Sequence, residues 1–590
     1  MDIVLLIAVI AFALLAFVLE WMPIDHVALV SLGLLLLFGL VSGEEAIAGF
    51  SNPAVVTVLM MLVLSSALVR SGVVSRFGHR IARLSGASPR VAFVTLILFT
   101  SAISAFINNT AAVAILIPVA LQLAKHYHIS PSRVLLPLSY GAILGGSITL
   151  VGTSTNLIVS ALAVDHGAAP ISMFELAPLG LVFLVVGGAY IALASDVLPI
   201  REEAGGSLTR KYELGGFLTE IRIPAGSPLV GRTVVSEKVS DRFRLNVLEI
   251  LRGKRKIAVD LRNTPLAPED VLIVRGAPED LVGFKDHFGL LMLTDTKLQD
   301  SDLADAHNLL AEVQLAPSSA LAGASVQEIN FRQRFSVFVL AIDRTGEAIR
   351  DKVASIPLKA WDTLLVFGPR ARVEALYEQA DFIPLEEHDL HLARPPRWWI
   401  PLVVVPTVVL LAALGVLSIL EASILGVVAL LVTRSLTLQK AYQSVDWSVI
   451  FLIAALIPLG TAMENTGLAT HVADVVVRVG AAWGPIAVLS LVYLLTALIT
   501  EGISNNAAAI LMVPIAAQVA LTLGVDPRPF FVAVAFAGST SFLTPMGYQT
   551  NAMVFGPGRY RFGDYIRFGW PLKILFWALA TWLIPVIWGM

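Results

Sequence analysis

Two apolar regions of the sequence each hold a short polar stretch at the same place, and this duplication limits what the chain can fold into. The first stretch is Asn108-Asn109-Thr110, and the second is Ser504-Asn505-Asn506. They align without a gap, and each is followed by an apolar run that reaches a proline. A lipid bilayer offers no water to amides and hydroxyls, so protein, a ligand or an ion must satisfy them. We therefore predict that the two stretches form the working site.

Composition places the chain among polytopic α-helical membrane proteins. Of its 590 residues, 56% are hydrophobic and only 14% are charged, and many apolar runs reach the roughly 18 residues that suggest a spanning helix. Cysteine is absent, which excludes disulfides, thiolate metal ligands and cysteine nucleophiles. The net charge of -3 is too small to imply a nucleic-acid partner.

Hydropathy divides the chain into three parts. Residues 1–200 and 396–590 are apolar, and residues 201–395 are polar and mixed. The apolar parts predict the same order of spans in two membrane repeats. In first-half and second-half pairs, the expected segments are 2–20 with 398–418, 25–42 with 421–434, 53–70 with 447–466, 90–125 with 483–523, 133–165 with 528–560, and 176–199 with 570–589.

Basic residues indicate the orientation of these segments, because Lys and Arg favour cytoplasmic loops. On this count both ends of residues 90–125 are cytoplasmic, so this stretch should enter and return as a re-entrant hairpin. The second hairpin should enter from outside. Each half then has five spans plus a hairpin, which gives the inverted repeat typical of secondary transporters. The residues counted as cytoplasmic are Arg70, Arg76, Arg80, Arg83, Arg90, Lys125, Arg133, Arg434, Lys440, Arg559, Arg561, Arg567 and Lys573.

The polar part is itself a repeat. Residues 218–221 match residues 310–313, and residues 269–276 match residues 361–368. Alternating Val, Ile and Leu between Gly, Pro and Asp is typical of strands, and a short helical pattern follows each matched run. We predict two small α+β modules in tandem, inserted on the cytoplasmic side.

Helix breaks inside a membrane create binding groups without formal charge. The second half of a broken helix presents free N–H groups that favour an anion, and the first half ends in carbonyls that favour a cation. A second pair of breaks follows at residues 151–156 and 546–551, where Asn156 and Asn551 occupy matching places. Four breaks would converge on one central site. The plainer alternative is that these polar residues only join helices, as they often do.

Glu501 directly precedes the second tip. A carboxylate at membrane depth is costly and often functional, so it could orient the tip, help a cation or take up a proton. It could equally be a membrane-edge residue or a structural partner of an arginine. No Ser-His-Asp set, phosphate-binding glycine loop or metal-ligand spacing stands out, so we do not expect an enzyme.

At these motifs the sequence resembles the divalent anion/sodium symporter family, over both membrane halves. That family carries Ser-Asn-Thr at each hairpin tip; here each triplet keeps its central Asn and changes one other position. The resemblance implies sodium-coupled uptake of sulfate or a dicarboxylate, an elevator-type mechanism and a homodimer. It implies anion contacts at Asn108, Asn109, Thr110, Thr153, Ser504, Asn505 and Asn506. It implies sodium ligands at Ser104, Asn109 and Gly152 and at Thr500, Ile503, Asn505 and Gly547.

The polar part resembles a tandem pair of TrkA-C (RCK C-terminal) modules at about 216–288 and 308–384. Such modules bind small regulatory ligands or dimerise, and the sequence does not fix a ligand. The insert favours the sulfate-type branch of the symporter family.

Three functions stay open on the sequence alone. The first is a sodium-coupled importer of an inorganic dianion, with sulfate favoured, in the inner cell membrane. The second keeps the fold and carries a C4-dicarboxylate or another oxyanion. The third is a ligand-gated anion channel or a sensor, which the regulatory modules suggest.

Overall fold

The chain forms two compact units in the computed structural model. One unit comprises Met1–Ile200 with Glu387–Met590, and the other comprises Arg201–Glu386. Three of the arginines used for orientation, Arg76, Arg80 and Arg83, lie outside the described residues. The structure describes residues 1–19, 21–73, 89–200, 218–243, 245–253, 255–257, 261, 263–276, 278–292, 308–316, 319–344, 347–349, 353–377, 379, 381–385 and 397–590.

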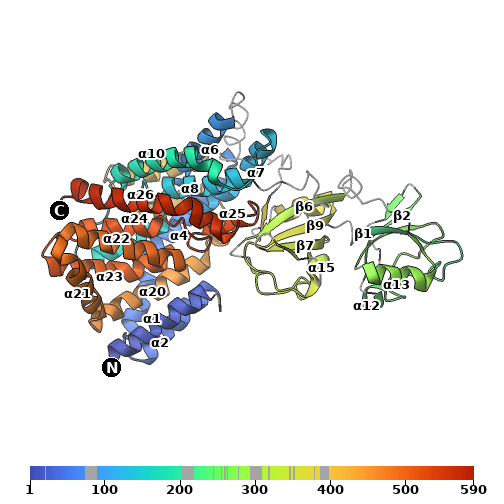
Figure 1. Ribbon diagram of the computed structural model, residues 1–590, viewed down its shortest axis with the longest axis horizontal. Coiled ribbons are helices and arrows are strands. Elements are labelled where there is room, and N and C mark those ends of the chain that lie inside the picture. The colour runs from blue at the N-terminus through green and yellow to red at the C-terminus, as the bar shows by residue number, and fades with distance from the viewer. Residues whose placement is uncertain are drawn as a thin grey trace. The chain divides into compact units, whose positions relative to one another are not determined.

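The first unit is helical throughout its described length (Figure 1). Its first half contains α1 (Asp2–Val18), α2 (Ile24–Leu37), the short α3 (Gly43–Ala48), α4 (Pro53–Arg70), α6 (Pro89–Ser104), α7 (Asn109–His126), α8 (Ser132–Gly146), α9 (Ser154–Asp165) and α10 (Ala177–Ala194). The second half contains α17 (Ile400–Ala413), α18 (Ile419–Val432), the short α19 (Leu438–Gln443), α20 (Trp447–Asn465), α21 (Leu468–Gly480), α22 (Pro485–Gly502), α23 (Asn505–Leu523), α24 (Arg528–Ser539), α25 (Gln549–Phe555) and α26 (Phe562–Trp588).

Most of these helices match the predicted segments, which is the helical, apolar architecture of a multi-pass membrane protein. Among the described residues, six helical stretches are long and apolar enough to cross a membrane: Gly43–Arg70, Ala177–Val197, Trp447–Asn465, Pro485–Gly502, Asn505–Leu523 and Phe562–Trp588. Seven shorter apolar helices of 10–17 residues accompany them. Opposite orientation of the two halves stays a prediction.

Two parts of the second half differ from the sequence prediction. The expected outer loop near residues 466–482 contains helix α21, whose buried side chains recur at helical spacing and pack on α22 and α23. The last helix begins at Phe562 rather than near residue 570, and Lys573 is therefore well inside α26. Its side chain is only 12% exposed, so Lys573 is enclosed by protein rather than free in a loop; the side of the membrane on which it lies stays a prediction.

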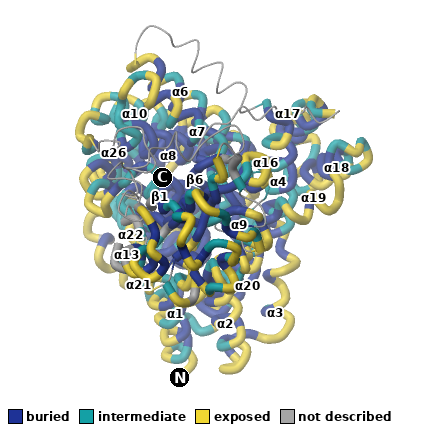
Figure 2. The backbone as a smooth tube through the Cα atoms, turned by 90° about the vertical axis from the view of Figure 1, so that its right-hand side faces the viewer, coloured by how far each residue is buried: buried dark blue, intermediate teal, exposed yellow. Residues whose placement is uncertain are grey.

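Burial in this unit is greatest around the broken helices. All residues of α8 except Arg133 are buried, as are all residues of α24 except Arg528, and the tube beside the α8 label in Figure 2 is mainly dark blue. By contrast, α18 alternates between buried and exposed residues, and α19 is exposed except at Ala441. A helix buried on every side is surrounded by protein rather than lipid. The interrupted helices therefore lie in the interior of the unit.

The second unit contains two five-stranded antiparallel sheets with the same strand order. The first sheet runs β3-β2-β4-β1-β5, and the second, reversed, runs β8-β7-β9-β6-β10. The strands of the first are β1 (Leu218–Arg222), β2 (Asn246–Arg252), β3 (Arg255–Ile257), β4 (Val271–Arg275) and β5 (Leu291–Met292). Those of the second are β6 (Asn308–Leu315), β7 (Phe338–Arg344), β8 (Glu347–Ile349), β9 (Thr363–Pro369) and β10 (Phe382–Pro384).

An equivalent arginine–aspartate ion pair occurs in each module of the second unit. Arg252 donates from Nε and Nη2 to Asp270 at 2.9 and 2.8 Å, and Arg344 donates in the same way to Asp362 at 2.8 and 2.7 Å. In each pair the aspartate is almost fully buried, so the two-pronged contact with arginine offsets its loss of water. Helices α13 (Pro278–Phe288) and α16 (Arg370–Tyr377) follow β4 and β9. The short helices α12 (Val239–Phe243) and α15 (Phe331–Phe335) precede β2 and β7.

Candidate functional site

The first polar stretch lies where α6 ends and α7 begins. Four residues leave the helix after Ser104, and Asn108 then caps α7 by accepting a hydrogen bond from the Thr110 N–H at 2.8 Å. Asn109 is buried, and its Oδ1 accepts from the Ser104 hydroxyl at 2.5 Å. Asparagine is a preferred capping residue because its side chain satisfies a free N–H group of the first turn. The tip is therefore a helix break that its own amides hold in shape.

The second polar stretch repeats this arrangement between α22 and α23. Ser504 caps α23 by accepting from the Ala507 N–H at 3.3 Å. The Thr500 hydroxyl donates to Oδ1 of the buried Asn505 at 3.3 Å, as Ser104 does in the first half. The preceding Ile503 leaves the helical conformation and is buried. Both triplets thus occupy the tip of a two-helix hairpin.

The expected second breaks separate α8 from α9 and α24 from α25, and each is held by a threonine and an asparagine. In the first, the Gly152 N–H donates to the Thr149 hydroxyl at 3.1 Å, and Asn156 Nδ2 donates to the Thr149 carbonyl at 3.0 Å. In the second, the Gly547 N–H donates to the Thr544 hydroxyl at 3.0 Å. Asn551 Nδ2 donates to the carbonyls of Ser541 and Thr544 at 3.0 and 3.2 Å. The two asparagines at matching places thus bridge freed backbone groups in the same way.

Each hairpin tip bonds to the break that belongs to the other half of the chain. From the first tip, Asn109 Nδ2 donates to the Tyr548 hydroxyl at 2.5 Å, and the Thr110 hydroxyl donates to Gln549 Oε1 at 2.8 Å. The Tyr548 hydroxyl donates in turn to Thr153 Oγ1 at 3.3 Å. Side chains from α7, from the residue before α9 and from the start of α25 therefore meet at one point.

The second tip makes the reciprocal contact. Asn506 Oδ1 accepts from the hydroxyls of Ser154 and Thr155, at 2.9 and 3.2 Å. The supporting asparagines also cross: Ser539 Oγ donates to Asn156 Oδ1 at 3.2 Å, and Ser139 Oγ donates to Asn551 Oδ1 at 2.7 Å. Helix α23 packs on α9, and α25 packs on α7 and α8. All four breaks are thus joined through one network of amides and hydroxyls.

Besides the seven-residue α25, three longer helices begin at this network. They are α7 with 18 residues, α9 with 12 and α23 with 19. The N-terminus of a helix carries positive partial charge and free N–H groups, so three of them around a junction favour an anion. The side chains that join them can both donate and accept hydrogen bonds. The junction is therefore suited to an oxyanion that is bound without a guanidinium or an ammonium group.

Close backbone approaches bring several of the expected cation ligands near one another, Asn109 and Gly152 around Gly146, and Thr500 beside Gly547. A Cβ on Gly146 would lie 2.5 Å from Asn109 Oδ1, and a Cβ on Gly152 would lie 2.4 Å from the Gly146 carbonyl oxygen. In the second half, a Cβ on Gly547 would lie 2.8 Å from the Thr500 carbonyl oxygen. Only glycine permits such approaches. Amide, hydroxyl and carbonyl oxygens are thus present at both places, and the described residues contain no cluster of three or more His, Cys, Asp or Glu side chains.

Several residues of the network were not predicted from the sequence. Tyr548, Gln549, Ser154 and Ser539 were not selected as site residues. Their signal in the sequence is weak because serine and glutamine near a break are common. Glu501 does reach the second break, but it contacts Lys573 and backbone groups rather than the tip triplet.

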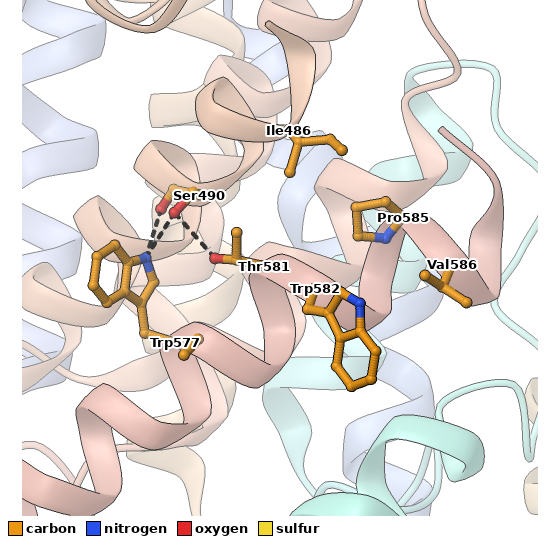
Figure 3. Close-up of a pocket in the computed structure, with 8 residues that line it drawn as sticks. Ile486, Ser490, Trp577, Thr581, Trp582, Pro585 and Val586 are labelled. Carbon is orange, nitrogen blue, oxygen red and sulfur yellow. Dashed lines mark hydrogen bonds between the residues drawn. The ribbon is translucent and has the colours of Figure 1, made fainter. Parts of the chain in front are cut away.

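A groove elsewhere in this unit is not part of the network. It has a volume of about 470 Å³ and lies between α22 and α26, lined by Ile486, Ser490, Trp577, Ala578, Thr581, Trp582, Pro585 and Val586 (Figure 3). Its polar groups bond to each other: Trp577 Nε1 and the Thr581 hydroxyl donate to Ser490 Oγ at 2.9 and 3.0 Å. The remaining lining is mainly apolar, which does not suit a dianion.

A multi-pass helical unit whose interrupted helices meet in a polar interior has the architecture of a membrane transporter. The chain belongs to the CitMHS citrate transporter family, whose model matches residues 14–537. It is 40% identical to an uncharacterised transporter, sll0640, of Synechocystis sp., over 100% of this chain and 98% of that protein. It is 31% identical to the Escherichia coli transporter YfbS, over 99% of both. Sodium/sulfate cotransporter 1 of Chlamydomonas reinhardtii is 22% identical, over 98% of this chain and 89% of that protein.

Proposed function

We propose that the protein is a sodium-coupled symporter that imports a divalent oxyanion, with sulfate as the favoured substrate. The observation that carries the proposal is the junction of three helix N-termini with side chains from all four breaks. Such a junction offers an oxyanion N–H and O–H donors but no fixed positive charge among the tip triplets. A dianion held this way needs counter-ions, which a cotransported cation supplies.

In this proposal, Asn108, Asn109, Thr110, Thr153, Ser504, Asn505 and Asn506 contact the anion. Sodium binds at two places, one around Ser104, Asn109 and Gly152 and one around Thr500, Ile503, Asn505 and Gly547. Carbonyl, hydroxyl and amide oxygens are suitable ligands for a hard cation. Because each group includes a hairpin tip and a break, sodium orders the same segments that bind the anion.

The remaining parts of the proposal concern the whole transporter. The binding site moves across the membrane by an elevator-type motion when it is empty or fully loaded. It does not move when only sodium or only the anion is bound. The two membrane halves have opposite topology, the protein works as a homodimer in the lipid of the inner cell membrane, and the insert lies in the cytoplasm. The two modules of the insert regulate transport by binding a small ligand or by dimerising. The names of the Chlamydomonas relatives support sodium and sulfate.

A proteoliposome experiment tests this function. Purified protein is reconstituted, a sodium gradient is imposed, and uptake of labelled sulfate is compared with uptake of labelled succinate and citrate. We expect saturable uptake of sulfate that disappears when potassium replaces sodium on both sides. Flux that neither saturates nor responds to the sodium gradient contradicts a symporter and supports a channel. Binding of sulfate without any flux supports a sensor.

A second substrate class is favoured by one finding. The family model that matches most of the chain describes citrate transporters, so a citrate or C4-dicarboxylate symporter is the alternative. The same assay decides, because succinate or citrate uptake then exceeds sulfate uptake under the same gradient.

A further inference from the structure

A buried pair of opposite charges lies beside the break between α24 and α25, close in sequence to the second tip triplet. Glu501 near the end of α22 is 8% exposed, and Lys573 of α26 donates from Nζ to Glu501 Oε1 at 2.7 Å. The same Nζ donates to the Thr540 carbonyl at 2.8 Å. Ionised groups inside a membrane are costly and are kept where they serve a purpose. The pair joins α22, α26 and the segment that follows α24.

The carboxylate of Glu501 accepts hydrogen bonds from three successive backbone N–H groups. These belong to Phe542, Leu543 and Thr544, at 3.0, 3.0 and 3.2 Å. The Ser541 hydroxyl adds a fourth bond at 2.9 Å. The Glu501 carbonyl accepts from the Thr544 hydroxyl at 2.8 Å. One side chain therefore satisfies the backbone donors of a whole non-helical turn, which have no helix carbonyl as partner.

In the first half, the corresponding backbone N–H groups find partners without a charged side chain. Aligning the breaks on their asparagines places Ser147 and Ile148 opposite Phe542 and Leu543. Their N–H groups donate to helix carbonyls, Ser147 to Ile143 at 3.2 Å and Ile148 to Gly145 at 3.1 Å. Aligning the tips places Ala105 opposite Glu501. Helix α8 thus continues two residues further than α24, and in the second half the carboxylate accepts the hydrogen bonds that helix carbonyls accept in the first.

The position of this turn determines which backbone groups the second break can present to a ligand. Its own carbonyls are engaged, because Asn551 bonds those of Ser541 and Thr544 and Lys573 bonds that of Thr540. The next residues lead to Gly547, which packs against the Thr500 carbonyl. The backbone that approaches the second proposed cation site is therefore held in position by the Glu501–Lys573 pair.

We propose that Glu501 and Lys573 are positioning residues that set the affinity of the second cation site alone, so that the two cation sites differ in strength and in dependence on charge. This inference rests on the proposed function, because it names what controls one of its two sites. Glu501 acts through backbone N–H groups and does not touch the ion or the anion.

Glu501→Gln is the first test, in the reconstituted full-length protein. The amide keeps the shape but replaces one acceptor oxygen by a donor, so at least one charge-assisted bond is lost. We expect the sodium concentration for half-maximal uptake to rise by about tenfold or more, since such bonds correspond to at least that factor. Uptake at saturating sodium should stay within about threefold of wild type, because positioning affects affinity first. Glu44→Gln, at an exposed glutamate of α3, is the matched control.

The double variant Glu501→Gln/Lys573→Met separates positioning from simple charge balance. If the pair only neutralises itself, removing both charges restores the wild-type sodium dependence. If Glu501 positions the turn, the double variant recovers the amount of folded protein but keeps the raised sodium requirement. Hydrogen exchange gives a readout that does not need transport. The amides of residues 542–544 should exchange at least about tenfold faster in Glu501→Gln than in wild type, and the amides of residues 147 and 148 should not change.

The outcomes distinguish this inference from the proposed function. If wild type transports no dianion in response to sodium, the proposed function fails, and unchanged exchange at residues 542–544 additionally overturns the positioning role. If wild type is sodium-driven but Glu501→Gln keeps its sodium dependence and its exchange rates, the inference is wrong and the function stands. Should Glu501→Gln not reach the membrane, the sodium dependence and the exchange of residues 542–544 are measured in the double variant, where wild-type values for both overturn the positioning role.

Discussion

Removal of the central asparagine from each hairpin tip separates a structural role from a binding role. Asn109 makes two short hydrogen bonds, from Ser104 and to Tyr548, both at 2.5 Å. Its counterpart Asn505 accepts one long bond from Thr500 at 3.3 Å. The two asparagines are therefore equivalent in the proposed chemistry but unequal in the folded structure, and this contrast gives the experiment its power.

The expected costs follow from these contacts. A buried hydrogen bond contributes about 1 kcal/mol, and leaving a buried partner unsatisfied costs about 1–3 kcal/mol. Asn109→Ala should therefore destabilise the protein by roughly 2–4 kcal/mol, because it leaves the Ser104 and Tyr548 hydroxyls with one bond fewer. Asn505→Ala should cost only about 1 kcal/mol, because its bond is long. Loss of a direct cation and anion ligand, by contrast, should abolish sodium-dependent uptake in both.

The assay pairs two measurements on the same preparations. Thermal unfolding in detergent reports stability, and sodium-driven uptake in proteoliposomes reports function, each normalised to folded protein. We expect unequal shifts in stability and equally complete loss of uptake. Sodium-dependent uptake of normal rate in either variant removes the site assignment. A loss of uptake that follows stability, severe in Asn109→Ala and slight in Asn505→Ala, indicates that these asparagines only join helices.

Three further predictions concern other parts of the chain. Gly547→Ala should abolish sodium-dependent uptake while the insert stays folded, because the new methyl group would lie 2.8 Å from a carbonyl oxygen; normal uptake contradicts the close approach. Arg344→Met should lower the free energy of unfolding of the second module by about 3 kcal/mol, measured by hydrogen exchange in the full-length protein, because Asp362 is left buried without its cation; exchange unchanged throughout β6 to β9 contradicts this. Partial burial raises the pKa of Glu175, but hydrogen bonds from Arg528 and a backbone amide outweigh it and leave that pKa below 4.5. The stabilisation from this pair is thus present above pH 4.5 and is lost as the pH falls through the lowered pKa. The difference in the free energy of unfolding between wild type and Arg528→Gln should therefore shrink in acid. A difference that does not depend on pH rules out the ion pair as its source.

Local sequence was sufficient to locate the helix breaks. An asparagine or serine in an apolar run has a local effect, since it caps the next helix and ends the previous one. Asn108 and Ser504 do this in the structure. Gly152 and Gly547 mark the second breaks for a similar reason, because their backbone approaches a carbonyl or hydroxyl group of another segment. These features depend on a few neighbouring residues and are therefore readable from the chain alone.

The pairing of the breaks was beyond the sequence. Nothing near Tyr548 indicates that its hydroxyl meets Asn109, because that contact depends on the packing of many helices. The burial of Lys573 was missed for a related reason. A lysine near a membrane edge usually extends to water, and here its burial depends on Glu501 and the Thr540 carbonyl, which only the packing brings together. Helix α21 was missed because it carries charged residues and lies between two long apolar runs, a pattern that is also typical of a loop.

The crossed contacts between the halves also bear on how the chain is made. The amide of Asn109 and its partner Tyr548 are separated by 439 residues. At synthesis rates of about 5–20 residues per second, the ribosome needs roughly 20–90 s to cover that distance. During this interval the newly inserted first half holds an unfinished polar centre, whose amides and hydroxyls must use temporary partners such as water or the insertion machinery. The polar centre is thus the last part of the membrane unit to mature, and a nascent chain that stalls within the insert leaves a half that cannot complete it.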